Sequence, residues 1–131
     1  MDLKRYETDP RLSQEGVWKT IDGAQFLIAA NNNPKHRRKL NRERKKHNPA
    51  KLAKDIDALT ELSIEAAIGT VLLDWSGIRY GDQPFPFSEE NARKLLGHAE
   101  LRNEIFTEAQ DLENFQIEAT AADGANLKSG A

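Results

Sequence analysis

The feature that most constrains the fold is a pair of strand-prone segments on either side of Asp22-Gly23. Residues 16–30, GVWKTIDGAQFLIAA, place apolar and β-branched side chains before and after this dipeptide. Asp-Gly suits a two-residue type I′ turn, in which both central residues have positive φ, so the segment predicts a β-hairpin. An isolated hairpin is only marginally stable in water and must pack on helices or pair with another chain. We expect residues 3–8, LKRYET, to supply a third strand.

A strongly basic segment follows the predicted hairpin. Residues 33–49, NPKHRRKLNRERKKHNP, contain eight Lys and Arg residues and one acid. Asn33 can cap a helix, and Pro34 suits the first helical position, where its missing N–H would be unpaired in any case. The predicted helix, about residues 34–47, has one aliphatic residue and no apolar stripe. We therefore expect it to lie largely in solvent, with His36 and His47 exposed.

From residue 50 onward, apolar residues recur at spacings of three and four. This period is typical of an amphipathic helix, and a second apolar row indicates burial on more than one side. We predict one core helix over about residues 51–75, in which Gly69 marks a close contact between helices. An aromatic loop at residues 76–87, SGIRYGDQPFPF, follows, because its glycines and prolines oppose regular structure.

Two further helices are predicted at about residues 88–96 and 99–118. Ser88 caps the first of them, with acidic residues placed favourably in its first turn. The small residues of 119–131 predict a flexible tail. The expected fold class is mostly α with a small N-terminal β-hairpin (α+β), in a single compact domain over residues 1–118.

The charges are divided unevenly along the chain. Residues 1–49 carry 12 basic and 6 acidic residues, a net charge of +6, and residues 50–131 carry 7 and 15, a net charge of −8. This division favours self-association of copies of the chain. No apolar stretch approaches the roughly 20 residues that a membrane span needs, and the N-terminus lacks the apolar segment of a signal peptide. We expect a cytoplasmic protein with no membrane partner.

The sequence offers no recognisable catalytic constellation. It contains no Gly-rich phosphate loop after a strand, no HExxH and no GxSxG motif. The absence of cysteine excludes disulfides, zinc–thiolate sites and thiol catalysis. The acidic residues of the last helix lack the spacing of a calcium loop. We therefore expect a protein that is not an enzyme and has no cofactor.

The basic helix admits two interpretations. Eight cations between Lys35 and Lys46 favour phosphate backbones through counterion release. Against this, no aromatic residue is interleaved for base stacking, and the chain as a whole is slightly acidic. The alternative partner is an acidic protein surface, including the acidic last helix of a neighbouring subunit.

Residues 70–96, TVLLDWSGIRYGDQPFPFSEENARKLL, resemble the central signature of the tail assembly chaperones of long-tailed bacteriophages. In that family an apolar helix ends in a Leu-x-x-Trp element, and a Gly-containing loop and a Pro-aromatic-Ser start to a short helix follow. The matching residues are Leu72, Asp74, Trp75, Gly77, Gly81, Pro86, Phe87, Ser88, Ala92, Leu95 and Leu96. The flanks are also similar, so the resemblance covers most of residues 16–128. It departs at His36, where the family has an aromatic residue, and in the closing GANLK, where a Lys-Asn pair is more usual.

The resemblance implies an assembly function. Such chaperones bind the aggregation-prone, helical tape-measure protein, keep it soluble, promote polymerisation of the tail-tube protein around it, and leave before the virion matures. We accordingly expect these two partners and further copies of the chain, in the host bacterial cytoplasm. Two other functions stay open: a structural virion component, such as a tail or head-completion protein, and a nucleic-acid-binding module that uses the basic helix. Nucleic acid is the less favoured partner once the resemblance is considered.

The predicted partner surface combines the aromatic loop with the basic helix as an electrostatic rim. A helical amphipathic partner needs exposed apolar surface, and the charge keeps the complex soluble. The residues assigned to this surface are Trp75, Tyr80, Phe85, Phe87, Arg37, Arg38, Arg42 and Lys45. For Trp75 and Phe87 a place in the core is the stronger alternative. Charge reversal at the four cations should disrupt assembly and leave the fold intact.

Overall fold

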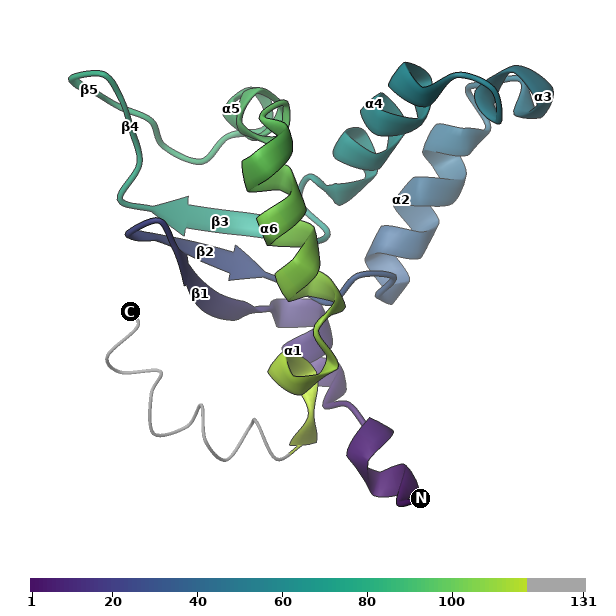
Figure 1. Ribbon diagram of the computed structural model, residues 1–131, viewed down its shortest axis with the longest axis vertical. Helices are drawn as coiled ribbons and strands as arrows, with labels where there is room; N and C mark the ends of the chain where they lie inside the picture. Colours follow the sequence, from purple (N-terminus) through teal and green to yellow (C-terminus); the bar gives the residue numbers. More distant parts are fainter. Residues whose placement is uncertain (118–131) are drawn as a thin grey trace.

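A computed structural model describes residues 1–117, which form a three-stranded antiparallel sheet surrounded by helices (Figure 1). The predicted class, mostly α with a small β element in an α+β fold, is confirmed. In chain order the elements are η1 (Leu3–Tyr6), α1 (Pro10–Glu15), β1 (Val17–Ile21), β2 (Ala24–Ile28), α2 (Pro34–Arg44), α3 (Pro49–Leu52), α4 (Ile56–Ala67), β3 (Leu72–Ser76), β4 (Arg79–Tyr80), β5 (Gln83–Pro84), α5 (Glu89–Leu96), α6 (Ala99–Gln110) and η2 (Leu112–Phe115).

The predicted hairpin is confirmed as β1 and β2. The two strands pair in the register Val17↔Ile28 to Ile21↔Ala24, and the turn between them has φ of 49° at Asp22 and 79° at Gly23. Positive φ at both positions is the requirement that Asp-Gly satisfies in a type I′ turn. The local sequence therefore sets both the turn and the register of this hairpin.

The third strand is not the predicted one. Residues 3–8 form the 3₁₀ helix η1 and a single bridge from Thr8 to Gln116. The second edge of β2 is instead occupied by β3, in antiparallel register with Phe26 opposite Trp75 and a bulge between Leu27 and Ile28. The sheet order is β1-β2-β3, so a segment 44 residues further along the chain (72 minus 28) completes it.

The predicted core helix over residues 51–75 is wrong in its extent. This segment is divided among α3, α4 and β3, and α4 ends at Ala67. Gly69 adopts φ of +76° and its N–H donates to the carbonyl of Leu72 at 2.9 Å, so it reverses the chain rather than marking a helix contact. A Cβ added there would meet nothing within 4 Å. The spacing of three continues into β3 because its pairing with β2 has a bulge between Leu72 and Asp74, and the extra residue turns both Leu72 and Trp75 into the core.

The helices α5 and α6 pack on the sheet and complete the core. Ser88 caps α5 as predicted, accepting from Asn91 N at 3.0 Å. The helix predicted over residues 99–118 ends at Gln110, because Asp111 is extended and its carboxylate caps η2 instead. Residue 118 and the predicted tail at 119–131 lie outside the described residues. The largest fully buried side chains are Phe26, Phe115, Ile28, Leu72, Leu96, Ile105 and Val71.

Helices α2 and α4 form an arm that projects away from the sheet (Figure 1). α2 runs outward, α3 lies at the tip, and α4 returns beside α2 to the start of β3. At the tip Ile56 is 78% exposed and Leu59 is 39% exposed. The basic segment therefore belongs to a helical hairpin and is not an isolated helix in solvent.

Candidate functional site

The aromatic loop predicted at residues 76–87 contains a short two-stranded hairpin, β4 and β5. Trp75, the residue before this loop, holds it in place by three contacts. Its Nε1 donates to the carbonyl of Phe85 at 2.7 Å. Its ring stacks on Phe85 at 5.8 Å between centroids and 2° between planes, and meets Phe87 edge-on at 5.0 Å. Such aromatic pairs contribute about 0.5–1.5 kcal/mol each beyond the area they bury.

The four predicted aromatic residues come together but differ in exposure. Trp75 is 5% exposed and lies in the core, where it positions the loop. Phe85 and Phe87 are half-buried. Tyr80 is 64% exposed, lies 6.2 Å from Phe85, and has the Lys94 ammonium 4.5 Å from its ring centroid. We call the outward face formed by Tyr80, Phe85 and Phe87 the aromatic hairpin surface.

An open groove runs beside the aromatic hairpin surface. It lies between β3 and the loop, and both Leu73 of the strand and the PFPF segment of the loop contribute to its lining. The groove is lined by Leu73, Asp74, Trp75, Ser76, Gly77, Ile78, Pro84, Phe85, Pro86 and Phe87. The lining combines aliphatic and aromatic side chains with one carboxylate, a composition that suits an amphipathic segment of a protein.

The first turn of α2 is anchored by a polar side chain. Asn33 is 5% exposed. Its Oδ1 accepts from His36 N at 3.1 Å, and its Nδ2 donates to the carbonyls of Ala30 at 2.8 Å and Thr70 at 2.7 Å. The predicted cap is confirmed, and the same side chain also joins the end of β2 to the connection before β3.

The expectation that α2 lies in solvent with His36 exposed is wrong for one of its faces. His36 is 7% exposed and its Nδ1 accepts from Asn32 N at 2.8 Å. Burial lowers the pKa of His36, and the charge of Lys39 lowers it further. The Lys39 ammonium donates to the carbonyl of Ile68, and burial lowers the pKa of Lys39 as well. Asn33, His36 and Lys39 are three residues apart, which places them on one face of the helix. Because their side chains are polar, the pattern of apolar residues did not predict that this face is buried.

The four predicted cations do not share one face of α2. Arg37 points toward the sheet end of the arm, where its guanidinium donates to the carbonyl of Asn32 at 3.2 Å. Arg38, Arg42 and Lys45 lie on another face and line a groove together with Lys35, Asn41 and Thr70. We call this the cationic groove. Within residues 1–117, none of its four cations forms an ion pair.

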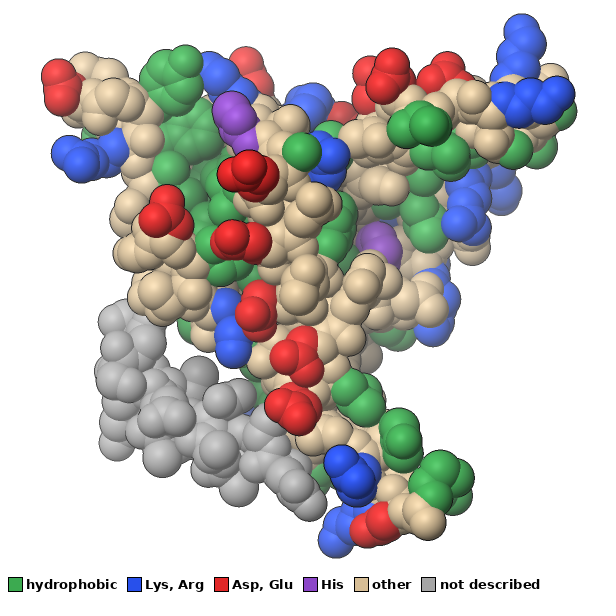
Figure 2. Space-filling view, viewed as in Figure 1, with side chains coloured by type: hydrophobic (Ala, Val, Ile, Leu, Met, Phe, Trp, Pro, Cys, Tyr) green, Lys and Arg blue, Asp and Glu red, His purple; other side chains and the backbone are tan. Residues whose placement is uncertain are grey.

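The aromatic and basic residues form two separate surfaces rather than one surface with a charged rim. In Figure 1 the β4–β5 hairpin lies at the upper left and the arm at the right, with α5 and α6 between them. Figure 2 shows blue side chains gathered on the arm, far from the hairpin. A short segment of a partner that contacts the aromatic hairpin surface therefore does not contact the cationic groove as well.

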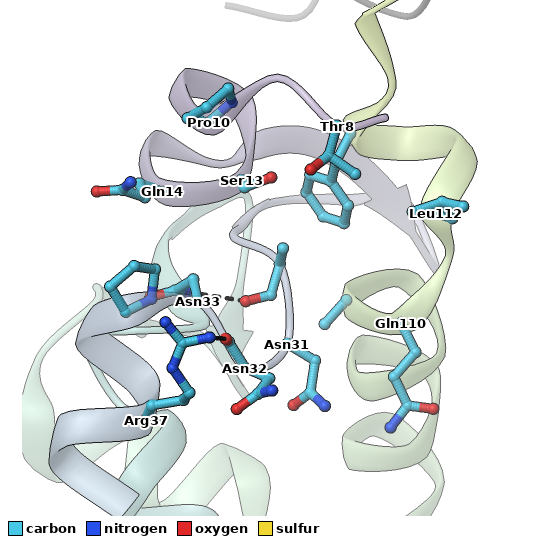
Figure 3. Close-up of a pocket in the computed structure, with 14 residues that line it drawn as sticks. Thr8, Pro10, Ser13, Gln14, Asn31, Asn32, Asn33, Arg37, Gln110 and Leu112 are labelled. Carbon is cyan, nitrogen blue, oxygen red and sulfur yellow. Dashed lines mark hydrogen bonds between the residues drawn. The ribbon is translucent and has the colours of Figure 1, made fainter. Parts of the chain in front are cut away.

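A third hollow, which sequence reasoning did not identify, lies where α1, the β2–α2 connection and α6 meet. Figure 3 shows the amide side chains of Asn31, Asn32 and Gln110 around it, with Arg37 reaching the backbone oxygen of Asn32. Phe115 and Leu112 contribute apolar lining. Amide groups can donate to and accept from a peptide backbone. The sequence signal for this hollow is the run of three asparagines at residues 31–33, of which only Asn33 was assigned a role, as a helix cap.

The described residues hold no cluster that suggests metal chemistry. Within residues 1–117 no group of three or more His, Cys, Asp or Glu side chains could hold a metal ion. None of the helices in this part of the chain is long and apolar enough to cross a membrane.

Comparison with known proteins decides the origin of the chain. A family model described as "YdaY prophage protein" matches residues 21–126, from the hairpin turn through α6 and beyond. The chain belongs to the YdaY prophage protein family. No curated protein and no solved structure matches it. Membership of the YdaY family establishes a phage-derived protein, and the matched segment contains the cationic groove, the aromatic hairpin surface and nearly all of the core.

Proposed function

We propose that this YdaY-family protein is a phage tail assembly chaperone that is not an enzyme. In this role it binds the tape-measure protein, keeps it soluble and promotes polymerisation of the tail-tube protein around it. The phage origin and the resemblance of residues 70–96 to the chaperone signature support the proposal. The structure departs from that signature in one respect, because Leu72 and Trp75 lie on β3 and not at the end of a helix.

The aromatic hairpin surface is the observation that carries the proposal. Tyr80 exposes 64% of its surface and is backed by Phe85, which in turn stacks on the buried Trp75. An aromatic side chain held out on a hairpin would lose little conformational freedom on binding, because its support already fixes it. Amphipathic helices bind to such apolar surfaces through side chains spaced three and four apart.

Co-expression with the tape-measure protein of the same prophage tests the proposal. The tape-measure protein should be insoluble alone and soluble with this chain, and the two should co-purify. Tyr80→Ser should reduce the soluble fraction several-fold. Tyr6→Ser is the matched control, because Tyr6 is 59% exposed and lies on η1, away from the hairpin.

Two results would overturn the proposal. One is a tape-measure protein that stays insoluble and unbound in the presence of the wild-type chain. The other is a loss of solubility that is the same for Tyr6→Ser and Tyr80→Ser, which would show that the aromatic hairpin surface is not the site. Mass spectrometry of purified virions separates the chaperone from a structural virion component, since a chaperone should be absent from them.

A further inference from the structure

The cationic groove has four positive charges and no anion among the residues that the structure describes. Lys35, Arg38, Arg42 and Lys45 follow one another at spacings of three and four along α2, so they share one face. At a rise of about 1.5 Å per residue they span roughly 15 Å. Other cations of the helix are engaged within the chain: Lys39 donates to Ile68 and Lys46 pairs with Glu43 at 3.0 Å. The groove thus presents a row of repelling charges that an anionic surface would neutralise.

The chain itself presents a matching anionic row. Glu100, Glu104, Glu108 and Asp111 follow one another at spacings of four, four and three along α6 and its C-cap. Figure 2 shows acidic side chains in a row down the centre of the molecule, over α6. Helical rise gives this row a length of roughly 16 Å, close to that of the cationic groove. Glu108 is half-buried and pairs with Lys19 at 3.6 Å, whereas the other three acids are exposed.

The two rows do not meet within one molecule. α2 lies in the projecting arm at the right of Figure 1, and α6 lies across the sheet at the centre. The ion pairs within residues 1–117 join neither row to the other. We propose that the cationic groove of one copy binds the acidic face of α6 on a second copy. The opposite charges and the similar lengths of the two rows favour a second copy over an unrelated acidic partner.

This contact joins two different surfaces, so each copy can bind one neighbour through its groove and another through α6. Such heterologous contacts produce rings when the rotation closes and open filaments when it does not. The aromatic hairpin surface takes no part and stays exposed on every copy. An assembly would therefore present this surface repeatedly, and a long partner with repeated helical segments would bind it with higher avidity than a single copy. The inference does not depend on the tape-measure protein being that partner.

A charge-swap experiment tests the contact directly. Arg38→Glu with Arg42→Glu reduces the net charge of the groove cations from +4 to zero and leaves the α6 row acidic. Glu100→Lys with Glu104→Lys reduces the net charge of the α6 row from −4 to zero and leaves the groove basic, so a mixture keeps one intact groove and one intact acidic row. Each double variant alone should be monomeric in sedimentation velocity at low salt, and an equimolar mixture should associate again. The matched control for Arg38→Glu with Arg42→Glu is Arg5→Glu with Arg11→Glu, which makes the same change in net charge at exposed positions on the N-terminal segment. The wild type and this control should associate at about 50 mM salt and dissociate at about 500 mM.

Circular dichroism of each variant establishes that it is folded before its association is interpreted. The proposal is overturned if the wild-type chain is monomeric at low salt and high concentration. It is also overturned if either double variant associates like the wild type, or if the mixture of the two fails to associate. Binding of duplex DNA that Arg38→Glu with Arg42→Glu removes, with no self-association of the wild type, would assign the groove to nucleic acid instead.

Discussion

The side chain of Asn33 both caps α2 and joins two backbone segments, and different substitutions at this position distinguish the two roles. As a helix cap, its Oδ1 accepts from His36 N; as a clamp, its Nδ2 donates to the carbonyls of Ala30 and Thr70. Asn33→Ala removes all three hydrogen bonds. Loss of a cap costs about 1 kcal/mol. Each carbonyl left without this donor adds about 1 kcal/mol, so we expect about 3 kcal/mol of lost stability in total.

Asn48 provides a matched control. It also precedes a proline and caps a helix, accepting from Ala50 N and Lys51 N. Unlike Asn33 it is exposed, and within residues 1–117 its amide nitrogen donates to no carbonyl of a distant segment. Asn48→Ala should therefore cost no more than about 1 kcal/mol. Urea unfolding, followed by circular dichroism and tryptophan fluorescence, measures both variants.

Asn33→Asp distinguishes the cap from the clamp. The carboxylate preserves the cap, yet it would face two carbonyl oxygens where the amide now donates. We expect this variant to lose about 2 kcal/mol in spite of the favourable helix dipole. The reasoning is refuted if Asn33→Asp is as stable as the wild type, or if Asn33→Ala costs no more than Asn48→Ala.

Three further predictions concern the turn after α4, the buried histidine and the aromatic loop. Gly69→Ala should lower the unfolding free energy by about 1 kcal/mol, because φ is +76° there. In a continuous helix the same change would raise the unfolding free energy, so the sign of the change measured by urea unfolding distinguishes a turn from a helix. Burial lowers the pKa of His36 below its ordinary 6.5, so its contribution to stability is complete above pH 6.5 and declines as the pH falls from there through the folded-state pKa. The unfolding free energy of His36→Gln should accordingly change less than that of the wild type between about pH 7.5 and 5.5, and an equal change would contradict the assignment. Trp75→Phe removes the hydrogen bond to the Phe85 carbonyl, at a cost of about 1 kcal/mol, and should accelerate amide hydrogen exchange at residues 76–87 but not in β1; uniform acceleration in both would mean that Trp75 supports the whole core.

The candidate surfaces could be predicted in part. The aromatic residues were identified because aromatic and proline residues in a glycine-containing loop are conspicuous in the sequence, and they do come together. Their individual exposures could not be predicted, because Trp75 is buried by tertiary contacts, with Phe26 opposite it in the sheet and Phe85 and Phe87 packed on its ring. The cations were identified by their number, and helical spacing alone separates Arg37 from Arg38, Arg42 and Lys45. The tertiary structure adds Thr70, a residue far along the chain, to the lining of the cationic groove. The hollow lined by the three asparagines forms where α1, the β2–α2 connection and α6 meet, and local sequence does not predict contacts between segments so far apart.

The sequence by itself determined the features that depend on neighbouring residues. Asp22-Gly23 sets the hairpin turn, and Asn33-Pro34 and Ser88 start their helices, because each acts on a backbone only a few residues away. Tertiary structure decided which segment completes the sheet, since the free edge of β2 requires a partner that local periodicity does not specify. It also decided that His36 is buried and that the aromatic and cationic surfaces lie apart. Those outcomes depend on contacts between residues far apart in the chain, whose geometry exists only once the core has formed.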